Sequence, residues 1–80
     1  MTNMEKYIDV FSRMFEISAD EARNLHYQDI DAWDSVGHMT LISELEETFN
    51  IEMDADDIID FESFEKGIEL LSKKEYGIKF

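Results

Sequence analysis

The residues best suited to chemistry stand together at Asp34-Ser35, directly before an amphipathic stretch that ends near Phe49. Serine and aspartate are both preferred at the start of a helix, where either side chain can cap a free backbone N–H group. A helix start also favours a phosphate, because its free N–H groups and its dipole both suit an anion. Asp34 could hold a metal or orient an incoming group. The sequence leaves two roles open for Ser35, a structural cap and a hydroxyl at a phosphate site.

A nucleophile–base pair is a second chemical reading, because Ser35 and His38 would share one helical face. No third member of a triad and no oxyanion donors can be identified. A chain of 80 residues also has little room for a pocket that excludes water. We therefore expect His38 to be an exposed helix residue and the protein not to be an enzyme.

Metal binding was considered at Asp54, Asp56 and Glu65, which match the first, third and last positions of a calcium loop. Ile58 and Ile59 stand where this loop needs an oxygen ligand and a glycine, so the match fails. The chain has no cysteine and therefore no thiolate ligand. We expect no dedicated metal site.

The charge is strongly one-sided, with 20 acidic against 7 basic residues and a net charge of −13. No lysine or arginine occurs between Arg23 and Lys66. Nucleic acids and anionic membrane surfaces are unfavourable partners for such a chain, whereas a basic protein surface is complementary to it. The chain shows no secretory signal and no membrane-spanning apolar run, so we expect a single cytoplasmic domain over residues 1–80.

Apolar residues recur at helical spacing through most of the chain, which predicts an all-α fold. We expect a small bundle of three main helices plus one short helix, with a long loop between the first and second. The predicted helices cover residues 3–15, 35–48, 55–60 and 64–73. Within the long loop, Ser18 and Glu21 form a capping-box pattern that predicts a single helical turn ending near Asn24.

The core is predicted from the apolar stripe of each helix. The second helix should turn four residues inward, namely Met39, Ile42, Leu45 and Phe49, with Leu41 beside them. Ile58 and Ile59 should anchor the short helix. The tail after Gly77 cannot be placed from its pattern.

Two further patterns carry a resemblance to a known family. The first is Asp34-Ser35-Val36, an Asp-Ser pair followed by an apolar residue. The second is the run of residues 45–51, Leu-Glu-Glu-Thr-Phe-Asn-Ile, which lies behind it in the same predicted helix. Together with the length and acidity, these patterns resemble the acyl carrier proteins, the phosphopantetheine-dependent carrier family.

The resemblance implies that a phosphopantetheinyl transferase attaches 4′-phosphopantetheine to Ser35, with Asp34 flanking the site. Acyl or aminoacyl groups would then ride as thioesters on the thiol of this arm. The implied partners are an acyl- or aminoacyl-loading ligase and an acyl-accepting transferase or synthase, and the carrier would be a monomer. Val36, Glu46 and Glu47 match the positions that partners recognise in this family.

Three residues of the recognition helix depart from the pattern of the fatty-acid carriers. Gly37 and Thr40 replace acidic residues, and Ser43 replaces an exposed methionine. We count these three among the partner-binding residues, and they favour a specialised pathway over fatty-acid synthesis. Gly37 weakens a helix by roughly 0.5–1 kcal/mol relative to alanine, which suggests a close approach of the backbone near Ser35. The alternative function is an unmodified acidic helical adaptor that docks on a basic protein.

Overall fold

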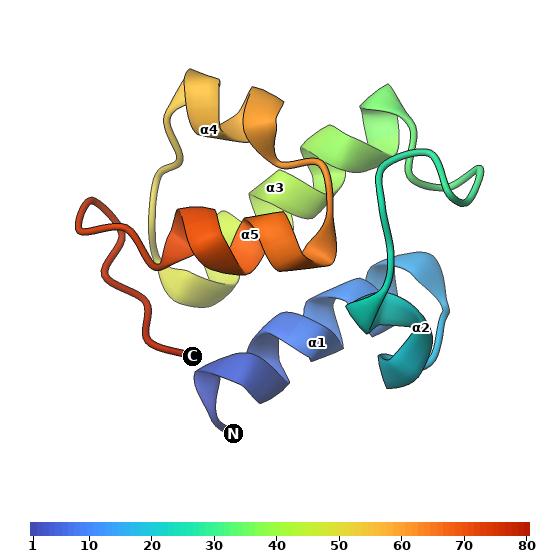
Figure 1. Cartoon of the computed structure of the whole chain (residues 1–80), viewed down its shortest axis with the longest axis horizontal. Coiled ribbons are helices and arrows are strands. Elements are labelled where there is room, and N and C mark those ends of the chain that lie inside the picture. Colours follow the sequence, from blue (N-terminus) through green and yellow to red (C-terminus); the bar gives the residue numbers. More distant parts are fainter.

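The computed structural model describes all 80 residues, and its regular elements are five helices without a β-strand. The helices are α1 (Asn3–Phe15), α2 (Ala19–Arg23), α3 (Ser35–Phe49), α4 (Ala55–Asp60) and α5 (Phe64–Leu71) (Figure 1). The all-α prediction is confirmed, and α2 is the single turn predicted inside the long loop. The last helix is two residues shorter than predicted. None of the helices is both long enough and apolar enough to cross a membrane.

The helix boundaries follow from local capping groups. Capping boxes start α1 at Thr2 and α2 at Ser18, where each hydroxyl accepts the backbone N–H three residues later. Ser63 caps α5 in a similar way, by accepting the N–H of Lys66. Asn50 ends α3 in the left-handed conformation, with a φ of 54°, which asparagine tolerates better than most residues.

An aromatic cluster forms the centre of the core. Phe11 of α1 packs edge-on against Trp33 of the long loop and against Phe64 of α5. Tyr7 is fully buried, and its hydroxyl donates a hydrogen bond of 2.7 Å to the carbonyl oxygen of Phe64. Burial raises the pKa of Tyr7 well above its ordinary value. The long loop and α5 are therefore both anchored on α1.

The inward face of α3 differs from the prediction. Ile42 and Leu45 are buried as expected, but Leu41 is fully buried whereas Met39 is 52% exposed. The buried stripe runs through Leu41 and Leu45 back to the half-buried His38, at helical spacings of three and four residues. The prediction placed Met39 inward because it gave His38 no structural role.

The short helix α4 is anchored differently from the prediction. Ile58 is half-buried, but Ile59 is 77% exposed, so its predicted anchoring role is wrong. Asp57 is buried instead, and it accepts hydrogen bonds from Lys73 and Tyr76. The acid thus ties α4 to the segment that follows α5.

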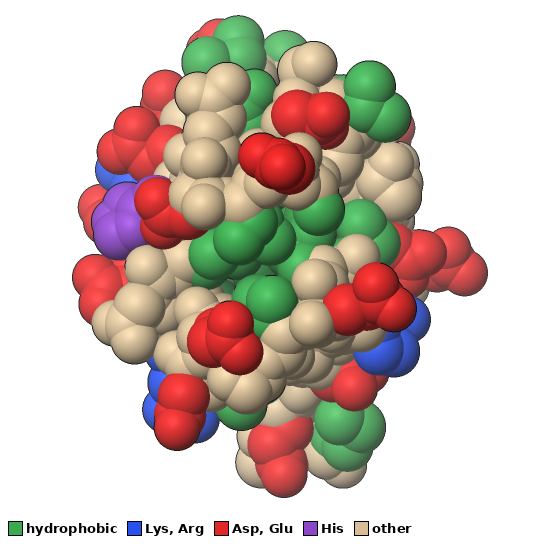
Figure 2. All heavy atoms as spheres, turned by 90° about the vertical axis from the view of Figure 1, so that its right-hand side faces the viewer, with side chains coloured by type: hydrophobic (Ala, Val, Ile, Leu, Met, Phe, Trp, Pro, Cys, Tyr) green, Lys and Arg blue, Asp and Glu red, His purple; other side chains and the backbone are tan.

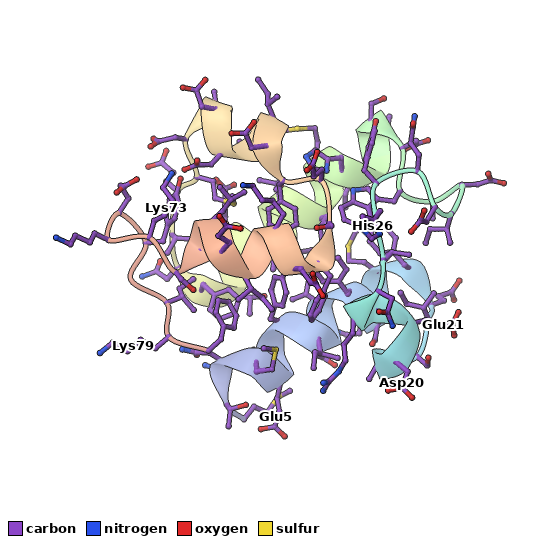
Figure 3. The ribbon with its side chains drawn as sticks, viewed as in Figure 1. Glu5, Asp20, Glu21, His26, Lys73 and Lys79 are labelled. Carbon is purple, nitrogen blue, oxygen red and sulfur yellow. The ribbon has the colours of Figure 1, made fainter.

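The tail is fixed against the first helix, a placement that the sequence pattern did not give. Ile78 is buried and its N–H bonds to the carbonyl of Leu71, while the amide of Asn3 donates to the carbonyl of Lys79. The two termini consequently lie close together (Figure 1). Lys73 and Lys79 lie at the end of the molecule away from α2 (Figure 3).

Candidate functional site

Ser35 is the first residue of α3, and its cap is supplied by its neighbour. The Asp34 carboxylate accepts the backbone N–H of Gly37 at 2.8 Å and thereby satisfies one of the free N–H groups of the first turn. Of the two capping candidates in the sequence, Asp34 holds the position. Ser35 is exposed and its hydroxyl is not needed for capping.

Gly37 allows the preceding loop to pass close to the first turn of α3. A Cβ atom at this position would overlap the carbonyl oxygen of Ala32. Ala32 precedes the fully buried Trp33, so this carbonyl has little freedom to move away. The close approach expected from the sequence is therefore present, and it explains a glycine in a helix where alanine is intrinsically better.

The electrostatics of the α3 start suit an anion attached to Ser35. The Asp34 carboxylate caps this helix end, but the N–H groups of Ser35 and Val36 have no partner, and with the helix dipole they favour negative charge. Val36 beside it is 73% exposed, so the hydroxyl and its surroundings are open to another protein. A phosphate joined to the Ser35 oxygen would fit this position.

A pocket of about 450 Å³ opens beside Ser35, between the start of α3, the loop before it and α4. Its lining is mainly apolar and aromatic and consists of Tyr27, Ser35, His38, Met39, Ile58, Ile59, Phe61 and Glu62. Pockets of this size and character accommodate small organic groups. Figure 2 shows the side of the molecule that carries α2 and the loop, where an apolar area lies among acidic side chains.

His38 is not the exposed helix residue that we expected. Its Nδ1 accepts the indole N–H of Trp33 at 2.9 Å, and its Nε2 lies 2.7 Å from the carbonyl oxygen of Ile58. Both ring nitrogens are thus engaged, so neither is free to take a proton from Ser35. This arrangement does not support a nucleophile–base pair.

The residues predicted for partner binding fall into two groups. Four exposed residues are spaced by three or four positions and share one face of α3, namely Val36, Thr40, Ser43 and Glu47. Glu46 is half-buried and points to a neighbouring loop, where its Oε2 accepts the backbone N–H of Met53 at 2.9 Å. Gly37 is also half-buried and packs against Ala32.

One cluster of acids could be considered for a metal. Carboxylate oxygens of Asp54, Asp57 and Glu75 lie within 4.8 Å of one another. Lys73 already contacts two of them, at 2.8 Å from Asp57 and 3.5 Å from Glu75. The hydrogen bond from Lys73, with a second from Tyr76, lowers the pKa of Asp57. Lys73 therefore offsets one of the three negative charges, and the cluster as a whole stays acidic.

Sequence reasoning found Ser35 but missed the pocket beside it. Tyr27 and Phe61 are apolar residues of the kind that form cores, and nothing in their spacing separates a pocket wall from a core. The bond between Trp33 and His38 joins a loop to a helix, so helical periodicity carries no signal of it. The available signal was the position of His38, which lies in line with Leu41 and Leu45 at helical spacings of three and four residues.

Comparison with known protein families matches residues 8–71 to the family described as phosphopantetheine attachment site. No curated protein and no solved structure gave a significant match.

Proposed function

Because the match covers most of the chain, the protein belongs to the phosphopantetheine attachment site family, and we propose that Ser35 carries the 4′-phosphopantetheine arm that this family implies. The proposed function is that of a carrier, which holds acyl or aminoacyl groups as thioesters and passes them between enzymes. We propose no catalytic activity of its own.

The observation that carries this proposal is the exposed hydroxyl of Ser35 at a helix start that Asp34 already caps. Other serines contrast with it, because Ser18 and Ser63 each use their hydroxyl to cap a helix. Ser35 is the serine that combines a helix start with a hydroxyl free from capping. A modifying enzyme can use this hydroxyl without removing a stabilising bond.

The chain's own residues would hold and orient the phosphate end of the arm. Asp34 fixes the first turn of α3, and Gly37 keeps that turn against Ala32, so the Ser35 oxygen has a defined position. The transferase would join this oxygen, as it loses its proton, to the phosphorus of the arm, while the phosphoanhydride bond of coenzyme A breaks and adenosine 3′,5′-bisphosphate leaves. The N–H groups of Ser35 and Val36, which have no partner in the first turn, would stabilise the resulting phosphodiester. When bound, the arm supplies the terminal thiol on which a thioester forms.

The apolar pocket beside Ser35 supports an acyl cargo or an aminoacyl cargo with an apolar side chain. Its walls come from Met39 of α3 and from Ile58 and Ile59 of α4. Burial of an acyl chain is favourable by about 0.8 kcal/mol for each CH₂ group, so even a short acyl cargo would be stabilised by binding in this pocket.

The exposed face of α3 is the proposed surface for partners. Val36, Thr40 and Ser43 make its start nearly uncharged, and Glu47 adds negative charge further along. This distribution supports a specialised pathway over fatty-acid synthesis. The proposed partners are a phosphopantetheinyl transferase, a loading ligase and an acyl-accepting transferase or synthase, all encountered by a monomeric carrier in the cytoplasm.

The test is incubation with a promiscuous phosphopantetheinyl transferase and coenzyme A, followed by measurement of the intact mass. The wild-type protein should gain the mass of one arm, Ser35→Ala should gain nothing, and the control Ser72→Ala, at an exposed serine away from α3, should behave as wild type. No gain by the wild type, or a gain that survives Ser35→Ala, would overturn the proposal. If Ser35→Ala keeps full activity in cells while charge reversal at the exposed Glu47 abolishes it, the protein is an unmodified adaptor.

A further inference from the structure

The ring of His38 is held by two hydrogen bonds whose directions define its tautomer. The indole N–H of Trp33 can only donate, so the Nδ1 atom of His38, 2.9 Å away, must be the acceptor. In the neutral ring the hydrogen then lies on Nε2, which donates to the carbonyl oxygen of Ile58 at 2.7 Å. His38 therefore links a donor in the loop to an acceptor in α4.

These bonds join three segments around the candidate site. Trp33 is fully buried, and its indole lies beside the His38 ring and nearly parallel to it, with an interplanar angle of 15°. Tyr27 and Phe61 pack edge-on against the same ring. The His38 ring is thus held on the side of α3 that faces the core, one helical turn after Ser35. From this position its Nε2 atom contacts the Ile58 carbonyl oxygen of α4.

The bond to Ile58 acts on the wall of the pocket beside Ser35. Ile58, Ile59 and His38 all line this pocket. Helix α4 is only six residues long and its first residues have no side-chain cap, so tertiary contacts must hold it in place. The bond from His38 is a direct polar link between α3 and this short helix.

We propose that His38 is a positioning residue that holds α4 as a wall of the pocket and thereby shields an apolar cargo. The part concerning cargo rests on the proposed attachment of the arm to Ser35. The other ionisable side chains on the pocket are Tyr27 and Glu62, and no lysine or arginine lines it.

Two substitutions separate the two bonds. In His38→Gln the amide nitrogen stands near the position of Nε2 and can still donate to Ile58. In His38→Asn the shorter side chain can still accept from Trp33 but cannot reach Ile58. The two variants are similar in polarity, so a difference between them reports on the bond to α4.

The first measurement uses the unmodified full-length protein. Nitrogen NMR of the wild type should show the tautomer with hydrogen on Nε2 and a coupling across the hydrogen bond between Trp33 and His38. Amide exchange in α4 should be severalfold faster in His38→Asn than in the wild type, and His38→Gln should restore the slower rate. Equal exchange in the two variants, or the opposite tautomer, would overturn the positioning role.

The second measurement uses the protein loaded with octanoyl- or acetyl-phosphopantetheine. Hydrolysis of the octanoyl thioester should accelerate severalfold in His38→Asn but remain near the wild-type rate in His38→Gln, while the acetyl thioester should respond little. Equal octanoyl rates in both variants would overturn the shielding role. If the wild type cannot be loaded at all, the proposed function and the shielding role fail together, and the exchange measurement still decides whether His38 positions α4.

Discussion

Replacement of Gly37 by alanine tests whether the close packing before α3 is real. In an ordinary helix this change is favourable, by about 1 kcal/mol. Here the added Cβ atom would overlap the Ala32 carbonyl oxygen, and the buried Trp33 next to it restricts any movement of the loop. We therefore expect Gly37→Ala to destabilise the protein.

The magnitude follows from three opposing contributions. Overpacking costs about 1–3 kcal/mol, and displacement of the Asp34 cap from the residue 37 N–H costs about 1 kcal/mol, against a gain in helix propensity of about 1 kcal/mol. The net loss is about 2 kcal/mol. For a domain of this size, that loss lowers the melting temperature by about 8–16 °C.

The assay is thermal and urea unfolding, followed by circular dichroism and by the fluorescence of Trp33, the single tryptophan of the chain. The matched control is Ser43→Ala, at an exposed position of the same helix, where propensity alone should raise stability by up to about 0.5 kcal/mol. A Gly37→Ala variant as stable as wild type, or more stable, would refute the close approach as a constraint.

Three further predictions concern the acidic residues. The hydrogen bond from Lys73 lowers the pKa of Asp57. The stability that the ionised Asp57 adds to the fold is therefore complete above the pKa of an unfolded aspartate, about 3.9, and is lost as the pH falls through the lower pKa of the folded state. Asp57→Asn should therefore be less stable than the wild type at neutral pH, and it should lose less stability on acidification. The exposed control Asp56→Asn should follow the wild type in acid-unfolding curves. Screening relieves repulsion among the acids, so the melting temperature should rise with added NaCl or Mg²⁺, and a melting temperature independent of salt would contradict this. Glu47→Lys should slow modification by the transferase without changing the stability of the fold. Glu46→Ala should lower the free energy of unfolding by about 1 kcal/mol, because the Glu46 carboxylate accepts the backbone N–H of Met53. Equal stability of Glu46→Ala and the wild type in urea would contradict this role of Glu46.

Much of the fold could be predicted because its signals are local. The capping box at Ser18 depends on neighbouring residues, and it appears where the sequence placed it. Helical periodicity likewise predicted the bounds of α1, and the acidic residues at the start of α4 predicted those of α4. Each of these features is determined within a few residues of chain.

The remainder depends on contacts between segments distant in sequence. The burial of Asp57 requires Lys73 and Tyr76, which follow α5. The inward orientation of His38 requires the carbonyl of Ile58, 20 residues further along the chain. Neither partner can be identified from periodicity, so Ser35 could be placed at the start of a helix but the pocket beside it could not be predicted.

The central claim is that Ser35 carries the arm, and peptide-level mass spectrometry of the protein purified from its own cells tests it most directly. Fragmentation should locate a phosphopantetheine group on Ser35, and the intact mass should show an acyl or aminoacyl group attached to a fraction of the molecules. An unmodified Ser35 in a functional protein, or an arm on a different serine, would contradict the account.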